Sequence, residues 1–419
     1  MAQQNAAANK SYNILMLAPT MFFADYGNPV RILEEAVALQ QRGHRVTILA
    51  YPNGRDIANL DVRRCWGVPF NYRIEVGSSR HKVYLDVMLA LKSLGYVLKN
   101  KPDIIHAHMH EGALLGWFLS KLTGAPLLFD FQGSLTGEML DHHFLKKDSR
   151  FFKPLSWLEK RIDHLPKAIL TSSRNAAKLL TADYQVPTGK IHPTPDCANP
   201  ARFDPAALSN AEKIALKQSL GIPQDKQLLV FVGLLTEYQG VGLMLKALSI
   251  LKSQRNDFHL LLMGFPSVAY YQETARQLNI ADRVTFTGKM PYEHLVPHLA
   301  IGDIAIAPKL SATEGNGKIL NYMSMALPTL AFDTPVSKEY LGSLGLFPKS
   351  RSAESLAERI AHALDMSPAE KAELGQALRQ QVIAHYTWGK VGSQIETVYQ
   401  AVLAGHPQPA LMVKRATAN

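Results

Sequence analysis

The residues best suited to binding an anionic ligand lie in one short segment, PKLSATEGNGKILNYMSMALP, over residues 308–328. Its central turn consists of Glu314, Gly315, Asn316, Gly317 and Lys318. Glycines let backbone amides approach a ligand closely, and the helix expected to begin there adds partial positive charge. A diphosphate would fit this turn, with Lys318 or Lys309 neutralising it. An ordinary loop that places a carboxylate near a helix N-terminus is the alternative that these residues leave open.

Glu314 would repel a phosphate group. We therefore expect its carboxylate to accept hydrogen bonds from the hydroxyls of a sugar that lies beside the diphosphate.

Three histidines, His106, His108 and His110, alternate near the end of an expected strand. Side chains two residues apart on a strand share a face, so the three resemble a set of metal ligands. If the strand ends near His106, the later two lie on a loop and the alternation means little. We favour His108 as a residue that lines the ligand cleft, and we predict no metal site.

These residues need strands and helices to position them, and the first half supplies both. Short apolar strands are expected at 13–17, 46–50, 104–106, 127–131 and 168–171. Helical segments separate them, the first with Asn28 as its N-cap and Pro29 at its first position. Largely apolar strands alternating with helices indicate a buried parallel sheet.

Residues 192–205 contain four prolines and form the best linker in the chain. After this linker the same alternation resumes, with strands expected at 228–232, 260–263, 284–286, 304–307 and 329–332. The fold class is therefore α/β, with two doubly wound, Rossmann-like lobes. Ligands bind at the carboxyl ends of such strands, so we expect a cleft between the lobes.

The composition, 47% hydrophobic and 19% charged, is that of a globular protein, and 419 residues suffice for two domains. Residues 1–200 hold +7 of the net charge of +10, which suits an acidic partner. No nucleic-acid-reading motif is present. The absence of a long apolar run and of a signal-like N-terminus predicts a cytoplasmic protein. The two cysteines, Cys65 and Cys197, are expected to be reduced.

The order of the motifs resembles that of the retaining glycosyltransferase family 4 over residues 12–404. The segment at 308–328 looks like the donor-site signature of that family. The other pieces, in chain order, are YNILMLAP, GNPVRILEEAVALQQRGHRVTI, PDIIHAH, KAILTSS, PARFDP, LLVFVGLL, YQGVGLMLKAL, ADRVTFTG, GDIAIAP and HYTWGKV.

The resemblance implies a GT-B fold and transfer of a sugar, with retention at the anomeric carbon, from a nucleotide-diphosphate sugar on the second lobe. Glu314 would contact donor-sugar hydroxyls, and the turn from Gly315 to Lys318 would bind the diphosphate. Gly27 and Asn28 match the first-lobe loop that faces the donor. Gly233 lies in the turn after the first strand of the second lobe. No cofactor is implied, and the lack of any Asp-x-Asp pair agrees with a metal-independent transferase.

The sequence departs from the family pattern at three places. The second family Glu falls on Asn321 when counted back from Pro328, and on Tyr322 when counted forward from Glu314. The Arg and Lys that hold the diphosphate align with Leu234 and Gln239. The His of a His-Gly pair aligns with Gln132. Charge-assisted hydrogen bonds contribute about 1.5–3 kcal/mol each, so another cation must substitute. Lys318 is the first candidate, followed by Lys309 and Arg31.

Cations and aromatic residues are interleaved in the segment 63–101, which includes an apolar helix expected over residues 83–98. This segment could seat the first lobe on an anionic membrane surface at the inner face of the cell membrane, or it could be a buried crossover helix with solvated ends.

We predict an acceptor-side domain over residues 1–200, a donor-binding domain over 201–385, and a final helix over 386–419 that crosses back to the first domain. The predicted activity is sugar transfer to a glycan, a lipid-linked molecule or a small molecule. The alternatives are a GT-B nucleotide-sugar 2-epimerase and a non-catalytic protein that binds sugar nucleotides or glycans.

Overall fold

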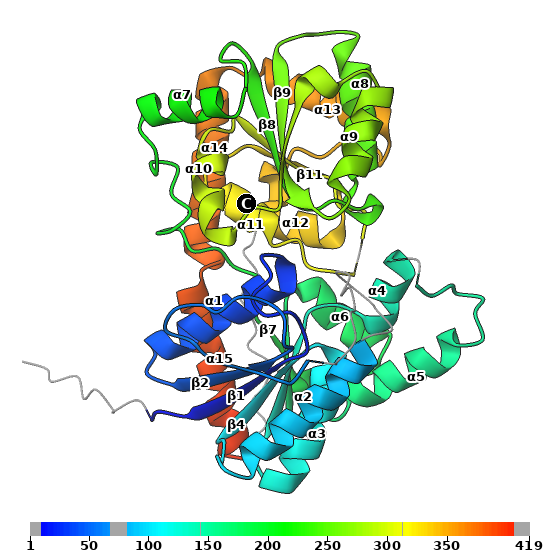
Figure 1. Ribbon diagram of the computed structural model, residues 1–419, viewed down its shortest axis with the longest axis vertical. Helices are drawn as coiled ribbons and strands as arrows, with labels where there is room; N and C mark the ends of the chain where they lie inside the picture. Colours follow the sequence, from blue (N-terminus) through cyan, green and yellow to red (C-terminus); the bar gives the residue numbers. More distant parts are fainter. Residues whose placement is uncertain (1–9, 68–81, 143, 312, 406–419) are drawn as a thin grey trace, which may run out of the picture.

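The computed structural model describes residues 10–67, 82–142, 144–311 and 313–405. These residues form two lobes, each built on one parallel β-sheet with helices on both faces (Figure 1). The predicted pair of doubly wound α/β lobes is confirmed.

The first sheet has seven strands in the order β3-β2-β1-β4-β5-β6-β7. Its strands are β1 Asn13–Ala18, β2 Arg45–Ala50, β3 Asp61–Arg64, β4 Ile104–His108, β5 Leu127–Phe131, β6 Ala168–Thr171 and β7 Ile191–Pro193. The helices of this lobe are α1 Gly27–Gln41, α2 Lys82–Val97, α3 Met109–Thr123, α4 Leu135–Asp141, α5 Phe152–Asp163 and α6 Arg174–Ala182. The edge strands β3 and β7 were not expected, because both are short and carry polar residues.

Alternation along β1 explains how the first sheet is covered. Ile14 and Met16 pack into the core shared with α1 and with the last helix of the chain. Leu15 and Leu17 point the other way, into the core shared with α2, α3 and α6. Successive strand residues face opposite sides, so a strand buried on both faces must be apolar throughout.

The second sheet has five strands in the order β10-β9-β8-β11-β12. Its strands are β8 Gln227–Leu234, β9 Phe258–Phe265, β10 Val284–Gly288, β11 Ile304–Ala307 and β12 Thr329–Ala331. The helices are α7 Asn210–Ser219, α8 Val241–Lys252, α9 Val268–Gln277, α10 Leu295–Ala300, α11 Lys318–Ser324, α12 Pro335–Leu341, α13 Ala353–Asp365, α14 Pro368–His385 and α15 Trp388–Leu403. Single 3₁₀ turns occur at η1 Thr188–Lys190, η2 Glu237–Gln239, η3 Ala281–Arg283, η4 Tyr292–His294 and η5 Gly342–Leu344.

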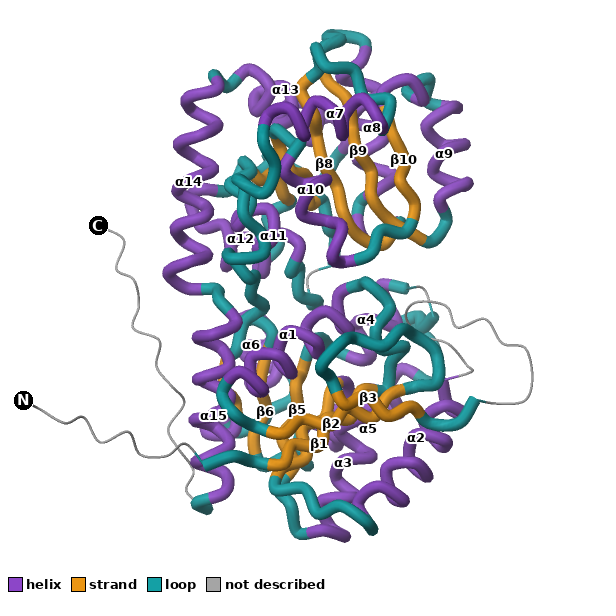
Figure 2. Tube along the Cα trace, turned by 60° about the vertical axis from the view of Figure 1, so that its left-hand side comes forward, coloured by secondary structure: helices purple, strands orange, loops and turns teal. Residues whose placement is uncertain are grey.

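The last helix, α15, leaves the second lobe and packs beside α1 of the first (Figures 1 and 2). The chain therefore crosses between the lobes twice. The two crossing segments lie side by side, because the Ala198 amide donates a hydrogen bond to the Tyr386 carbonyl at 3.0 Å. Apolar side chains run without interruption through this junction, so one of the three cores extends into both lobes.

The first helix begins earlier than expected. Its N-cap is Tyr26, so the prediction that Asn28 caps α1 is wrong. The Asn28 amide instead donates to the sulfur of Met109 at 3.6 Å. Both cysteines are free and buried.

None of the helices in the described ranges is long and apolar enough to cross a membrane.

The contact between α14 and α11 gives a test of the packing. A Cβ atom on Gly375 would lie 2.0 Å from the Ala326 carbonyl oxygen, which belongs to the backbone and cannot turn aside. We expect Gly375→Ala to lower the free energy of unfolding by about 1–3 kcal/mol. Gly95→Ala in α2 is the matched control, because nothing lies within 4 Å of its added Cβ. Thermal unfolding should show a lower melting temperature for the first variant alone, and equal melting temperatures would contradict this packing.

Candidate functional site

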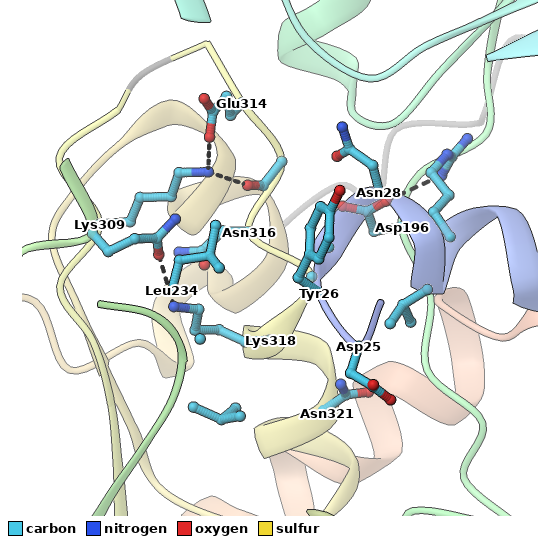
Figure 3. A pocket seen from close by; sticks show the side chains of 18 of the residues that line it. Asp25, Tyr26, Asn28, Asp196, Leu234, Lys309, Glu314, Asn316, Lys318 and Asn321 are labelled. Carbon is cyan, nitrogen blue, oxygen red and sulfur yellow. Dashed lines mark hydrogen bonds and ion pairs between the residues drawn. The ribbon is translucent and has the colours of Figure 1, made fainter. Parts of the chain in front are cut away.

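A pocket lies between the lobes, where the carboxyl ends of both sheets face each other. The first lobe supplies the loop before α1, the residue after β5 and the linker near Asp196. The second lobe supplies the loops after β8, β9 and β11 and the start of α11. Figure 3 shows Tyr26, Asn28 and Asp196 on one side, with Lys309, Glu314 and Lys318 on the other.

The structure brings together thirteen of the fourteen predicted site residues. These are Gly27, Asn28, Arg31, Gln132, Gly233, Gln239, Lys309, Glu314, Gly315, Asn316, Gly317, Lys318 and Asn321. Residues more than 280 positions apart in the sequence thus line one pocket. His108 is the exception.

Lys309 holds the glycine-containing turn in place. Its ammonium group lies 2.6 Å from Glu314 Oε2 and donates to the Gly315 carbonyl at 2.7 Å (Figure 3). The Lys309 side chain is buried, so Glu314 neutralises its charge inside the protein. Lys309 is therefore paired in this structure, and its predicted contact with a phosphate remains a prediction.

Lys318 is the pocket cation that forms no ion pair with any of the described residues. Its Nζ donates to Gln239 Oε1 at 2.8 Å and lies 4.3 Å from the centroid of the Phe231 ring. Burial, together with the nearby charge of Lys309, holds the pKa of Lys318 well below its usual value. An anion in the pocket would favour the charged form of this lysine and would be stabilised by it.

The space for the Lys318 ammonium group depends on Gly233. This glycine has φ +148°, and a Cβ atom there would lie 2.6 Å from Lys318 Nζ. Leu234 and Gln239, at the two positions where the family pattern has cations, also line the pocket. A lysine from α11 thus reaches the place where those two side chains carry no charge.

Arg31 lines the pocket but is already neutralised. Its guanidinium group forms ion pairs with Asp130 at 2.7 Å, Glu35 at 2.9 Å and Asp196 at 3.1 Å. Although burial acts in the opposite direction, the charge of Arg31 and a hydrogen bond from His108 keep the pKa of Asp130 well below its usual value. Arg31 is therefore fully paired in this structure, and its predicted role as a substitute phosphate ligand remains a prediction.

His108 does not line the pocket, which corrects the prediction for this residue. Strand β4 extends to His108, two residues further than expected, and its side chain is completely buried. His108 Nδ1 lies 3.1 Å from Asp130 Oδ2, which also accepts a hydrogen bond from the Gln132 amide at 2.7 Å. His108 can therefore affect a ligand only through these two neighbours.

The three histidines have separate partners rather than one common site. His106 Nδ1 lies 2.7 Å from the Tyr399 hydroxyl, and His110 Nε2 lies 3.2 Å from Asp163 Oδ1. Two smaller groups of buried side chains are compact enough to hold an ion. They are Glu35, His106 and His108, and His110, Glu159 and Asp163. His106 Nε2 lies 3.6 Å from Glu35 Oε2, and His110 Nε2 lies 3.7 Å from Glu159 Oε1. Neither group lines the pocket between the lobes.

Several buried polar atoms around the pocket have no hydrogen-bond partner among the described residues. Both polar atoms of the Asn316 amide are in this state, as is Gln132 Oε1. An unsatisfied buried polar group costs about 1–3 kcal/mol, and native structures contain few of them. These atoms lie on one pocket, where they are available to hydrogen-bond a polar ligand.

Two family models match the chain. The glycosyl transferase 4-like domain matches residues 27–197, and the glycosyl transferases group 1 model matches residues 212–381. The chain is a family 4 glycosyltransferase. The two matches together cover most of both lobes, so the assignment does not depend on one motif.

Known relatives agree with this family. The D-inositol 3-phosphate glycosyltransferase of Corynebacterium diphtheriae is 23% identical over 313 residues, which are 71% of this chain and 70% of that protein. The sucrose-phosphate synthase structure from Thermosynechococcus elongatus superposes with a TM-score of 0.78 at 19% identity, covering 94% of this chain and all of that one. Anabaena HepE in complex with UDP-glucose has a TM-score of 0.73 at 12% identity, with coverage of 93% and 100%. The fold of this glycosyltransferase is GT-B.

The structure distinguishes the two positions open for the second family Glu. Asn321 lines the pocket of the glycosyltransferase. Tyr322 is completely buried, and its hydroxyl accepts a hydrogen bond from the Val232 amide at 2.8 Å. The pocket position is therefore held by an uncharged amide.

Sequence reasoning missed three acidic residues of the pocket, Asp25, Glu138 and Asp196. Glu138 comes from α4, a short helix that was not expected, and Asp196 comes from the proline-rich linker. Asp196 lies against the turn of the second lobe, because a Cβ atom on Gly315 would be 2.6 Å from its Oδ2. No local pattern marks these residues, since the folding of the chain, and not their sequence neighbours, brings them to the pocket.

Glu138 gives a test that depends on pH. Burial and the nearby Glu314 raise the pKa of Glu138 to about 7, from an ordinary value of 4.5. A raised pKa in the folded state stabilises the protein below about pH 4.5, and this stabilisation is lost as the pH rises through 7. We expect Glu138→Gln to raise the melting temperature at pH 8 and to change it little at pH 4.5.

The control for this variant is Glu373→Gln on the exposed side of α14. Its melting temperature should differ from that of the wild type by the same small amount at both pH values. Thermal unfolding at the two pH values measures the difference. A melting temperature for Glu138→Gln that follows the wild type at both would contradict the assignment.

Proposed function

We propose that this glycosyltransferase moves a sugar from a nucleotide-diphosphate sugar to a hydroxyl of a glycan, lipid-linked or small-molecule acceptor. The reaction proposed proceeds with retention at the anomeric carbon and without a metal ion or other cofactor. The observation that carries this proposal is the Lys318 ammonium group, buried in the pocket between the lobes without an ion-pair partner among the described residues.

The diphosphate is proposed to lie against the turn from Gly315 to Gly317, with Lys318 as its counter-charge. A buried cation interacts strongly with an anion, because little water screens the pair. Helix α11 has only seven residues, so the charge of Lys318 contributes more than the helix dipole. HepE was solved with UDP-glucose, which supports a nucleotide-sugar donor in a protein of this fold.

The sugar is proposed to lie beside Glu314, whose Oε2 is held by Lys309 and whose Oε1 has no hydrogen-bond partner among the described residues. The Asn316 amide offers a further donor and acceptor for sugar hydroxyls or phosphate oxygens. Asn321 would contact the ribose, and Gly27 and Asn28 would face the donor from the first lobe.

The bond from the anomeric carbon to the diphosphate oxygen breaks in the proposed reaction, and a bond to the acceptor oxygen forms. Negative charge develops on the departing diphosphate. Lys318 and the amides of the turn are placed to stabilise that charge, which is where preorganised hydrogen-bond donors have most effect. We assign no side chain as a nucleophile.

A catalytically inactive binding protein is the second candidate, because Leu234 and Gln239 replace the cations of the family pattern. Lys318 reaches the same part of the pocket and argues against it. A 2-epimerase is distinguished by product analysis, since only a transferase consumes an added acceptor.

Lys318→Met should weaken nucleotide binding about tenfold to a hundredfold, because one charge-assisted hydrogen bond contributes about 1.5–3 kcal/mol. A thermal-shift panel of UDP-, GDP- and ADP-sugars first identifies the nucleotide, and calorimetry then measures its affinity. Lys246→Met, on the exposed side of α8, is the control. Wild-type affinity in Lys318→Met would contradict its role.

Glu314→Gln should lower kcat/KM for sugar transfer about 100-fold or more, because an amide replaces the carboxylate that would bind the sugar hydroxyls. Affinity for the nucleoside diphosphate without sugar should not fall, since the substitution frees the charge of Lys309. Steady-state transfer and calorimetry separate the two effects. Full transfer activity in this variant would refute the assigned role of Glu314.

A further inference from the structure

Exposed large hydrophobic side chains are concentrated on one part of the first lobe. Of the seventeen among the described residues, thirteen fall between residues 66 and 158. They are Trp66, Val83, Tyr84, Val87, Leu91, Leu94, Leu98, Phe118, Leu122, Phe144, Phe151, Trp157 and Leu158. A scattered exposed leucine needs no explanation, but a concentration of this kind marks an interaction surface.

Helix α2 carries the largest share of these side chains. Six of them, from Val83 to Leu98, lie on it or directly after it. A helix turns about 100° per residue, so these six fall within an arc of about 100°. The opposite side, with Leu85, Leu89 and Val97, is buried against the sheet. Helix α2 is therefore apolar on both sides, and one of these sides is exposed to solvent.

Helices α3 and α5 continue this surface. Helix α3 contacts both α2 and α5. The three helices cover one side of the first sheet, and α1 and α15 cover the other (Figures 1 and 2). Phe118 and Leu122 are exposed on α3, and Trp157 and Leu158 on α5. We call this surface the α2–α3–α5 face.

The charged residues on the face and in the segments next to its helices are mostly cations. The exposed cations are Lys99, Lys101, Lys121, Lys146, Lys147, Arg150, Lys153 and Arg161. Between residues 82 and 163, the described exposed acids are Asp103 and Asp148. A surface with this balance is complementary to an anionic partner.

Cations and aromatic rings of the face lie close together. Lys92 Nζ is 5.6 Å from the centroid of the Trp66 ring, and the Arg161 guanidinium carbon is 5.2 Å from that of Trp157. Rings with an apolar body and a polar edge, next to cations, suit the region where lipid headgroups meet acyl chains.

We propose that the α2–α3–α5 face docks on the surface of an anionic lipid bilayer. Exposed apolar side chains would enter the acyl boundary while the surrounding cations contact the headgroups. A second copy of the chain fits less well, because pairing two such faces would bring like charges together. The face extends beyond residues 63–101, because α3 and α5 also contribute exposed apolar side chains to it. Residues 68–81 of that segment lie outside the described residues.

Docking would also orient the enzyme. Helix α4, which brings Glu138 to the pocket, directly precedes the segment leading to α5. The first-lobe side of the pocket would then belong to the lobe that contacts the membrane. The docking proposal goes beyond the proposed function and does not rest on it.

The test measures co-sedimentation of the full chain with vesicles of phosphatidylcholine alone or of phosphatidylcholine with phosphatidylglycerol. We expect binding to the anionic vesicles only, weakened by added salt. We expect two variants to bind anionic vesicles more weakly than the wild type, each by about tenfold or more. They are Val87→Gln/Leu91→Gln/Leu98→Gln and Lys121→Gln/Lys153→Gln/Arg161→Gln.

Matched controls alter exposed residues of the second lobe. Ile214→Gln/Tyr270→Gln/Ile383→Gln is the control for apolar side chains, and Lys246→Gln/Lys349→Gln/Arg351→Gln is the control for cations. Both should bind vesicles like the wild type. Nucleotide affinity should be unchanged in all four variants, which separates a failure of docking from a failure of the donor site.

Two results would overturn the proposal. One is equal binding of anionic vesicles by the wild type and the two face variants, or no binding by any of them. The other is a wild-type dimer in analytical ultracentrifugation that Val87→Gln/Leu91→Gln/Leu98→Gln converts to a monomer, which would make the face an interface between two copies.

Discussion

The buried guanidinium group of Arg31 is the interaction on which the arrangement of the first lobe depends. It joins α1, where Arg31 lies, to Asp130 at the end of β5 and to Asp196 in the linker. A buried charge is tolerated only when it is paired, so these three segments must stay together. This cluster also positions parts of the pocket. Asp130 accepts a hydrogen bond from Gln132, and Asp196 lies against the turn at Gly315.

Of the three described cations that line the pocket, two are paired with carboxylates, and this leaves the third available to an anion. Arg31 and Lys309 are each neutralised by carboxylates, and both then serve to hold backbone and side chains in place. Lys318 differs because its hydrogen-bond partner, Gln239, carries no charge. The pocket therefore concentrates its electrostatic attraction at one ammonium group. That attraction lies on the second lobe, and the start of α1 lines the same pocket from the first lobe.

The sequence was sufficient for the fold, because buried parallel strands leave apolar runs that can be recognised without any partner. The strands at 127–131, 168–171 and 304–307 have the bounds expected. The turn at Glu314 was also recognisable, since its glycines and lysine are neighbours in the chain. The partners of Arg31 were not, because Asp130 and Asp196 are 99 and 165 residues away. The error at His108 came from the length of one strand, which decides whether its last side chain is buried.

The double crossing between the lobes has a mechanical consequence. The linker and the segment before α15 run side by side where Ala198 meets Tyr386, so both connections pass through one place. Two chain connections at a single edge act as a hinge. They permit the lobes to swing about that edge while resisting twist and sliding. Opening of the pocket is thereby restricted to rotation about nearly one axis. Each closure then brings the same residues of the two lobes to face each other.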